Sequence, residues 1–118
     1  MDTASQRIEL GRQFAAALDA CDYARAAGFL ADDCRYKCPE EEAIVGPQAI
    51  CESYRECDLL ARRNFSSVTY RSEAAVDASG GIRLTFFDEL ECGGARHTFR
   101  CSQIVYFDEN GMIVQIEL

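Results

Sequence analysis

Two adjacent glycines, at positions 93–94, separate two long segments whose residues alternate between apolar and polar, residues 81–92 and 95–107. Alternation of this kind is typical of β-strands with one covered face, and a glycine pair between two such strands is typical of a two-residue hairpin turn. The turn fixes the register, because once Cys92 lies opposite Ala95 every further pair follows from it. We therefore predict a long antiparallel hairpin at the centre of the fold.

The predicted register divides the hairpin into two faces. One face is mostly apolar, and we expect it to pack against helices. Its residues are Leu84, Phe86, Asp88, Leu90, His97, Phe99, Cys101 and Gln103. The other face is a ladder of polar and charged residues that suits solvent or a partner surface. Its residues are Glu89, Glu91, Arg96, Thr98 and Arg100. One extra residue in the turn would exchange the two faces, so every inference about the covered face depends on this register.

Strand patterns also cover residues 66–76 and 112–118, so the second half of the chain predicts an antiparallel meander joined by short turns. A shorter strand, residues 34–38, precedes it in the first half. Together with the helices of the first half, these strands predict one α+β domain over residues 1–118. Its three N-terminal helices should pack on one face of a curved, mostly antiparallel sheet.

Three helices are predicted in the first half. The first opens at Thr3 and carries apolar residues at helical spacing. Asp22 can cap a second, shorter helix that runs to about Leu30, and we expect residues 32–33 to close it. Pro47 follows a glycine and begins the third, at the helical position where proline is tolerated.

The charge and the termini limit the expected partners. A formal net charge of -8 at pH 7 argues against nucleic acid and anionic membranes, because an acidic surface repels phosphates. The N-terminal segment lacks the basic and apolar regions of a secretory signal, and no run of about 18 apolar residues occurs. We therefore expect a cytoplasmic protein with neither a nucleic-acid nor a membrane partner.

The chain contains seven cysteines, and in a reducing compartment disulfides are rare. Cys34 and Cys38 share one face of the predicted strand but stand roughly 13 Å apart. Two ligands of one zinc ion need sulfur atoms only ~2.3 Å from the metal. No C-x-x-C motif occurs. We predict no metal site and no cofactor, and we expect most of the thiols to be small buried hydrophobic groups.

Three motifs carry a family resemblance: Leu-Ala-Asp-Asp at 30–33 leading into a strand, the glycine at 46 before a helix, and Phe-Asp-x-x-Gly-x-Ile at 107–113. With them the chain resembles the nuclear transport factor 2-like superfamily, especially its SnoaL-like and ketosteroid-isomerase-like branches. The resemblance implies a cone-shaped, cystatin-like half-barrel around an apolar cavity, and a homodimer formed through the outer sheet face. It implies no single activity, because this fold hosts isomerases, cyclases, dehydratases, hydrolases and binding modules.

Ketosteroid isomerases use an aspartate base and an oxyanion hole made of a tyrosine and a protonated aspartate. The resemblance places the tyrosine on Phe14, the base on Cys38 and the protonated aspartate on Gln103. Phe14 has no hydroxyl group, and Cys38 and Gln103 have no carboxyl group. Steroid isomerisation by that mechanism is therefore not expected. The Gln103 amide keeps the ability to donate a hydrogen bond.

Asp88 and His97 are the candidate catalytic residues, because the register makes them diagonal neighbours on the covered face. Histidine titrates near neutral pH, and a carboxylate beside it stabilises the charged form. In the alternative interpretation His97, three residues past the turn, lies in solvent at the rim and merely pairs with Asp88. We predict a pocket wall made of Phe14, Tyr36, Cys38, Tyr54, Phe86, Phe99, Cys101 and Gln103.

Three functional hypotheses follow. In the first, a SnoaL-like domain holds a small, neutral, largely apolar ligand and can act on it as an acid–base enzyme of the isomerase, cyclase or dehydratase type. This hypothesis calls for a cavity of about 300 Å³ or more, lined by both Asp88 and His97. In the second, a non-catalytic module dimerises through the sheet. A third and weaker hypothesis is a thiol enzyme or redox sensor that uses Cys38. The second hypothesis, the non-catalytic module, predicts a cone filled by Phe14, Tyr36, Phe86 and Phe99.

Overall fold

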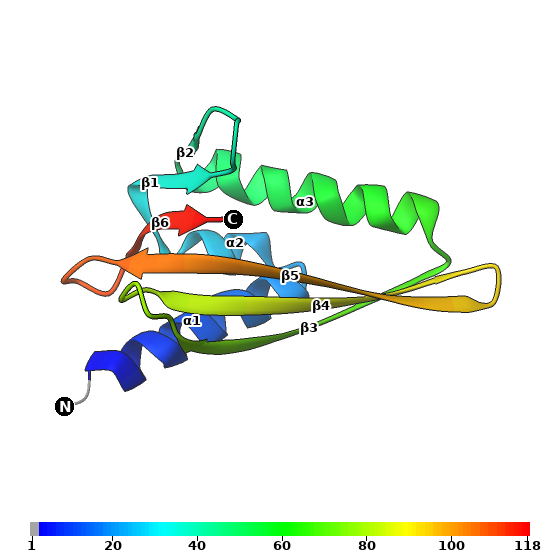
Figure 1. Cartoon of the computed structure of the whole chain (residues 1–118). Coiled ribbons are helices and arrows are strands. Elements are labelled where there is room, and N and C mark those ends of the chain that lie inside the picture. Colours follow the sequence, from blue (N-terminus) through cyan, green and yellow to red (C-terminus); the bar gives the residue numbers. More distant parts are fainter. Residues whose placement is uncertain (1–2) are drawn as a thin grey trace.

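The computed structural model describes residues 3–118, in which a six-stranded sheet carries three helices (Figure 1). The helices are α1 (Thr3–Asp19), α2 (Tyr23–Ala27) and α3 (Pro47–Asn64). The strands are β1 (Leu30–Lys37), β2 (Ile44–Val45), β3 (Ser67–Val76), β4 (Ile82–Cys92), β5 (Ala95–Phe107) and β6 (Ile113–Glu117). Their order across the sheet is β2-β1-β6-β5-β4-β3, and all neighbours are antiparallel except β1 and β6. The predicted α+β fold class is confirmed.

The central hairpin has the predicted register. Cys92 pairs with Ala95, and the ladder continues without a shift to Ile82 opposite Val105. The backbone φ is 59° at Gly93 and 81° at Gly94. A turn with positive φ at both central residues matches the twist of the two strands, and glycine adopts it without a steric penalty. The glycine pair therefore fixes which side chains face the helices.

The core lies between α1, α3 and the covered face of the sheet. Gly11 of α1 lies so close to β4 that a Cβ atom there would stand 3.2 Å from Ile82 Cγ2 and 3.3 Å from Leu84 Cδ2. A residue without a side chain is what lets the helix approach the sheet this closely. The largest fully buried side chains come from both layers: Phe14, Ile50, Ile82, Leu84, Ile113, Ile116, Val105 and Cys34.

The second helix is shorter than predicted. It ends at Ala27 instead of about Leu30, and residues 32–33, which we expected to close it, belong to β1. Leu30 pairs with Ile113 of β6. The backbone N–H of Ile113 donates to the Phe29 carbonyl oxygen at 2.9 Å. Sheet pairing that is distant in sequence thus overrides the local helical preference of this segment. The two-residue strand β2 was not predicted, because so short a segment has no detectable alternation.

The hairpin extends past the helices. Figure 1 shows β4 and β5 continuing beyond the end of α3 to a free turn. On the face that packs against helices further along, Leu90 of β4 is still buried, but the β5 residues near this turn are not covered. His97, Phe99 and Cys101 are all exposed, and Phe99 is 54% accessible. The face was predicted correctly, but the length over which helices cover it was not.

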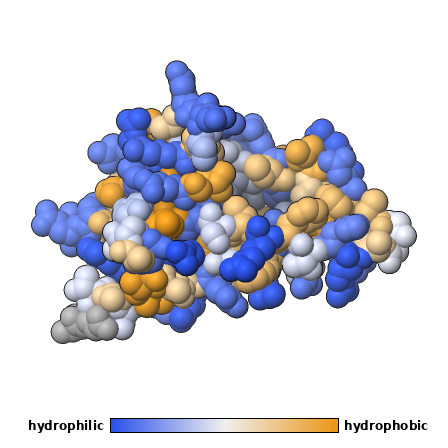
Figure 2. All heavy atoms as spheres, viewed as in Figure 1, coloured by the Kyte–Doolittle hydropathy of each residue, from blue (hydrophilic) through white to orange (hydrophobic). Residues whose placement is uncertain are grey.

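The surface in view mixes hydrophilic residues with hydrophobic ones, which gather both on the left of the view and on the right toward the projecting hairpin (Figure 2). Across the described residues, the large apolar side chains with the highest exposure are Val45, Leu59, Leu60, Val76, Phe99 and Leu118. Within residues 3–118, no helix has both the length and the apolar character needed to cross a membrane.

Candidate functional site

A pocket of about 280 Å³ lies between α1, α3 and the covered face of the sheet. Its volume lies just below the range for small-molecule sites, ~300–1,000 Å³, and so just below the size that the first hypothesis called for. The wall is largely apolar and aromatic, with three aspartates, and none of its residues is lysine, arginine or histidine. The lining residues are Leu18, Asp19, Tyr23, Tyr36, Ser53, Tyr54, Cys57, Asp58, Ala61, Tyr70, Phe86, Asp88, Cys101, Gln103 and Leu118.

Asp88 is the unpaired acid of this pocket. It comes from β4, on the face directed at the helices, and it is half-buried. Within the described chain its carboxylate makes no hydrogen bond and no ion pair with another side chain. Burial raises the pKa of Asp88 above its ordinary value, and the negative charge of Asp19 raises it further. A carboxylate of this kind holds a proton more readily than an exposed one.

Asp19, the last residue of α1, faces the same pocket. The Ser72 hydroxyl donates to Asp19 Oδ2 at 2.6 Å. Burial raises the pKa of Asp19, and the bond from Ser72 opposes this effect without cancelling it. The pocket thus holds two carboxylates with raised pKa values, of which Asp19 is anchored and Asp88 is free to meet a ligand.

The third acid, Asp58 of α3, is held by protein partners. Tyr70 O–H donates to Asp58 Oδ1 at 2.7 Å, and Arg62 Nε donates to both carboxylate oxygens at 3.0 Å. Burial would raise the pKa of Asp58, but these hydrogen bonds outweigh burial and lower it. Asp58 is therefore an ionised anchor that joins α3 to β3.

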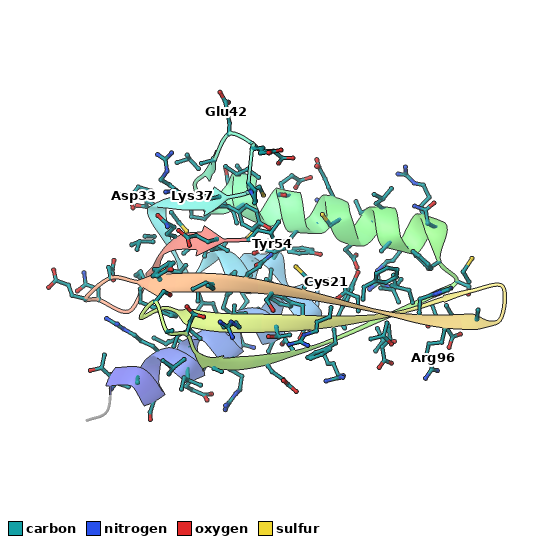
Figure 3. All side chains as sticks on the ribbon, viewed as in Figure 1. Cys21, Asp33, Lys37, Glu42, Tyr54 and Arg96 are labelled. Atoms are coloured by element: carbon teal, nitrogen blue, oxygen red, sulfur yellow. The ribbon has the colours of Figure 1, made fainter. Side chains whose placement is uncertain are left out.

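A hydrogen-bonded chain crosses the pocket from α3 to β1. Tyr54 extends from α3 toward the sheet (Figure 3), and its hydroxyl donates to Gln103 Oε1 at 2.6 Å. Gln103 Nε2 in turn donates to the Tyr36 hydroxyl oxygen at 3.0 Å. The two tyrosine rings meet edge to face with centroids 5.7 Å apart, and Phe14 packs in the same manner on Tyr54. Gln103 itself is only 5% exposed, so packing on all sides holds this chain in place.

The structure separates the two candidate catalytic residues. Asp88 lines the pocket, whereas His97 is exposed on the projecting part of β5 and does not line it. The ring centroid of His97 lies 6.5 Å from that of Phe99. Among the residues that the structure describes, no hydrogen bond or ion pair joins His97 to Asp88. The two share a face as predicted, but His97 lies in solvent, as in the alternative interpretation.

Five of the eight predicted wall residues line the pocket: Tyr36, Tyr54, Phe86, Cys101 and Gln103. The other three do not. Phe14 is fully buried behind Tyr54, and Phe99 is on the exposed hairpin. Cys38 is half-buried just past the end of β1, outside the wall.

Sequence reasoning missed Asp19, Asp58 and Tyr70. A signal for Asp58 was present, because it lies four residues after Tyr54 and therefore on the same side of α3. Tyr70 would have followed from the register between β3 and β4, which places it opposite Asp88. That register was not inferred, since the turn between these two strands is longer and less regular.

The seven cysteines are free thiols, and only Cys34 and Cys51 are buried. Our expectation that most of them would be buried is wrong: Cys57, Cys92 and Cys101 are exposed, and Cys21 and Cys38 are half-buried. Across the described residues, no group of three or more His, Cys, Asp or Glu side chains is placed to hold a metal ion.

No protein-family model matches the sequence, and no curated protein matches it either. Solved structures with low sequence identity do match it over 98% of its length. One is Bal32a from a soil-derived mobile gene cassette, with 16% identity, 89% of that chain covered and a TM-score of 0.73. Another is an LEH-like epoxide hydrolase of M. tuberculosis, with 19% identity, 83% covered and a TM-score of 0.67.

A third is a putative polyketide cyclase of Xanthomonas campestris pv. campestris, with 12% identity, 90% of that chain covered and a TM-score of 0.70. At these identities the likeness concerns the fold alone. The chain therefore shares the fold of these three structures, as the resemblance seen in its sequence implied.

Proposed function

We propose that the pocket binds a small, neutral, largely apolar organic molecule and that Asp88 exchanges a proton with it. The observation that carries the proposal is an unpaired carboxylate, half-buried in a pocket of about 280 Å³. An unpaired buried acid lowers stability, so a position of this kind is typical of a functional group. His97 is not needed for this chemistry, because a carboxylate with a raised pKa can act as the base by itself.

The lining favours a neutral ligand over an anionic one. Three aspartates line the pocket and only Asp58 has a basic partner, Arg62, so an anion would meet the uncompensated charge of Asp19 and Asp88. Tyrosine and phenylalanine rings supply most of the remaining wall, and these suit a compact cyclic or aromatic molecule. The proposed reaction type is proton transfer at carbon, as in isomerases, cyclases and dehydratases.

The experiment is deuterium exchange at carbon. Cyclohex-2-enone, a small neutral carbon acid, is incubated with the protein in D₂O, and loss of its exchangeable C–H signals is followed by ¹H NMR. We expect exchange above the buffer rate, reduced at least tenfold in Asp88→Asn and unchanged in the exposed control Asp33→Asn. Equal rates for the protein and for Asp88→Asn would refute the role of Asp88.

The cavity volume does not favour a cone packed shut by aromatic side chains, because Phe14 lies behind the wall and Phe99 lies outside it. A thiol mechanism at Cys38 has little support either. Cys38 does not line the pocket, and in the described part of the chain no hydrogen bond joins it to His97. We therefore favour acid–base chemistry at Asp88.

We also propose a homodimer formed through the outer sheet face. The helices leave this face of β3, β4 and β5 uncovered (Figure 1). It carries Phe87 with the Arg71 guanidinium 4.0 Å and the Arg100 guanidinium 6.0 Å from its ring centroid. Sedimentation at several concentrations tests the proposal. A dimer that dissociates in Phe87→Glu is expected, and a monomer at every concentration would contradict it.

A further inference from the structure

Asp19 is an acid of the pocket that the proposed proton transfer does not use. It ends α1 and lines the pocket, where the Ser72 hydroxyl donates to its Oδ2 atom at 2.6 Å. A neutral donor of this kind orients a carboxylate but does not cancel its charge. Within residues 3–118 no basic side chain forms an ion pair with Asp19. The ionised carboxylate therefore leaves negative charge at the pocket wall without a counter-charge.

The register between β3 and β4 brings Asp19 and Asp88 to the same part of the pocket. Ser72, which holds Asp19, lies directly opposite Phe86, and the next pair on this face is Tyr70 opposite Asp88. Phe86 is thus a neighbour of Asp88 along its own strand and a neighbour of Ser72 across the ladder. The charge of Asp19 reaches Asp88, since it raises the pKa of that carboxyl group. Two carboxylates and two aromatic rings therefore share one region of the wall.

Aromatic rings supply much of the remaining wall. Five of them line the pocket: Tyr23, Tyr36, Tyr54, Tyr70 and Phe86. Burial raises the pKa of each of the four tyrosines, so their hydroxyl groups stay neutral at pH 7. The face of an aromatic ring carries negative electrostatic potential and attracts a cation within about 6 Å of its centroid. The rings and the carboxylates therefore favour the same sign of charge in a ligand.

A metal ion does not suit this wall. Calcium and magnesium ions need about six oxygen ligands close to the metal. Across the described part of the chain, no group of three or more His, Cys, Asp or Glu side chains is placed to hold a metal ion. An organic ammonium ion needs no such coordination shell, because its charge is spread over alkyl groups that can pack on aromatic rings. The wall thus fits an organic cation better than an inorganic one.

We infer that the pocket binds small organic ammonium ions, and that it binds them more tightly than neutral molecules of the same shape. Asp19 and Asp88 supply the opposite charge, while Phe86 and Tyr70 supply ring contacts. Asp19 is then the residue that sets the preference for a positive ligand. The inference goes beyond the proposed function, which concerns a neutral molecule and a proton transfer by Asp88.

The test compares two probes that differ in charge and hardly in shape. Choline carries a quaternary nitrogen where 3,3-dimethylbutan-1-ol carries a carbon atom. Titration of each probe with the wild-type protein at pH 7, followed by ¹H NMR, gives the two dissociation constants. We expect choline to bind about tenfold more tightly than the alcohol. Equal affinities, or tighter binding of the alcohol, would overturn the inference without any variant being needed.

Variants then assign the preference to residues. Asp19→Asn keeps an oxygen that can accept from Ser72 but removes the charge, so choline should bind roughly 3- to 10-fold more weakly while the alcohol is unaffected. Phe86→Leu keeps an apolar side chain without a ring, and it should weaken choline more than the alcohol. The exposed Asp33→Asn is the matched control for a general change in net charge. Choline affinity that is equal in Asp19→Asn and in the wild type would refute the role of Asp19.

The readouts separate this inference from the proposed function. Choline binding that depends on Asp19, without deuterium exchange in cyclohex-2-enone, would refute the proton transfer and leave the cation site standing. Deuterium exchange that depends on Asp88, with equal affinities for choline and the alcohol, would refute the cation site and leave the proposed function standing.

Discussion

Asp19 and Asp88 face one pocket from the end of α1 and from β4, and neither carboxylate forms an ion pair within residues 3–118. Burial raises the pKa of both, and the charge of Asp19 raises that of Asp88 further. Such a pair disfavours the folded state at neutral pH, and this cost supports the functional role that we propose for Asp88.

Asp88→Asn should stabilise the protein at pH 7, by about 1 kcal/mol, because it removes an unpaired half-buried charge. The pKa of Asp88 is raised in the folded state, so the folded protein binds its proton more tightly than the unfolded chain does. Its contribution to stability therefore falls as pH rises from the unfolded value of about 3.9 through the folded value. Urea unfolding should show that the variant has a higher free energy of unfolding than the wild type at pH 7, and that this difference vanishes below about pH 4. An equal difference at both pH values would contradict the raised pKa of Asp88.

Tyr70→Phe, in contrast, should destabilise the protein at pH 7. It removes the 2.7 Å hydrogen bond that holds Asp58 ionised, and should cost about 1–2 kcal/mol at pH 7. The pKa of Asp58 is lowered, so its stabilising contribution is present above about pH 4 and is lost as pH falls through the folded pKa. The cost of the substitution, measured by urea unfolding, should shrink toward acid pH. Tyr106→Phe, which removes a hydroxyl bonded to Ser79 and Glu117 and not to Asp58, is the control, and a cost independent of pH would count against this role for Tyr70.

The thiols should fall into groups by alkylation rate. Cys34 and Cys51 are buried, and burial raises the pKa of Cys34 to about 11, so both should stay unlabelled until the protein unfolds. Cys101 is exposed, but burial of its sulfur and the charge of Asp88 raise its pKa. Asp88→Asn should therefore speed its alkylation. Mass spectrometry after iodoacetamide treatment measures each site, and rapid labelling of Cys34 in the native protein would contradict the packing.

Gly81→Ala should destabilise the protein by about 1–3 kcal/mol. A Cβ atom at this position would stand 2.6 Å from Ile104 Cγ2 and 2.9 Å from the Val105 carbonyl oxygen, and backbone cannot move aside cheaply. Thermal unfolding monitored by circular dichroism measures the loss, with the exposed Ala78→Ser as a control. No loss of stability would mean that β4 and β5 are not in the register described.

Much of the fold could be predicted because local signals decide it. The glycine pair at 93–94 fixes the register that brings Asp88 and Gln103 to the covered face, and Pro47 marks the start of α3. What failed depends on distant contacts. Local spacing cannot tell how far the helices extend along a strand, and this extent leaves His97 in solvent while Asp88 is covered. The direction of the chain through Tyr54 is likewise set by three elements that only the fold brings together.

The central claim is that Asp88 is a base poised for a ligand in this pocket. The most direct test is the pKa of its carboxyl group, measured by ¹³C NMR with and without saturating cyclohex-2-enone. We predict a midpoint above the ordinary value of 3.8 that falls in Asp19→Asn and moves when the ketone binds. A midpoint at or below 3.8 that neither change affects would contradict the account.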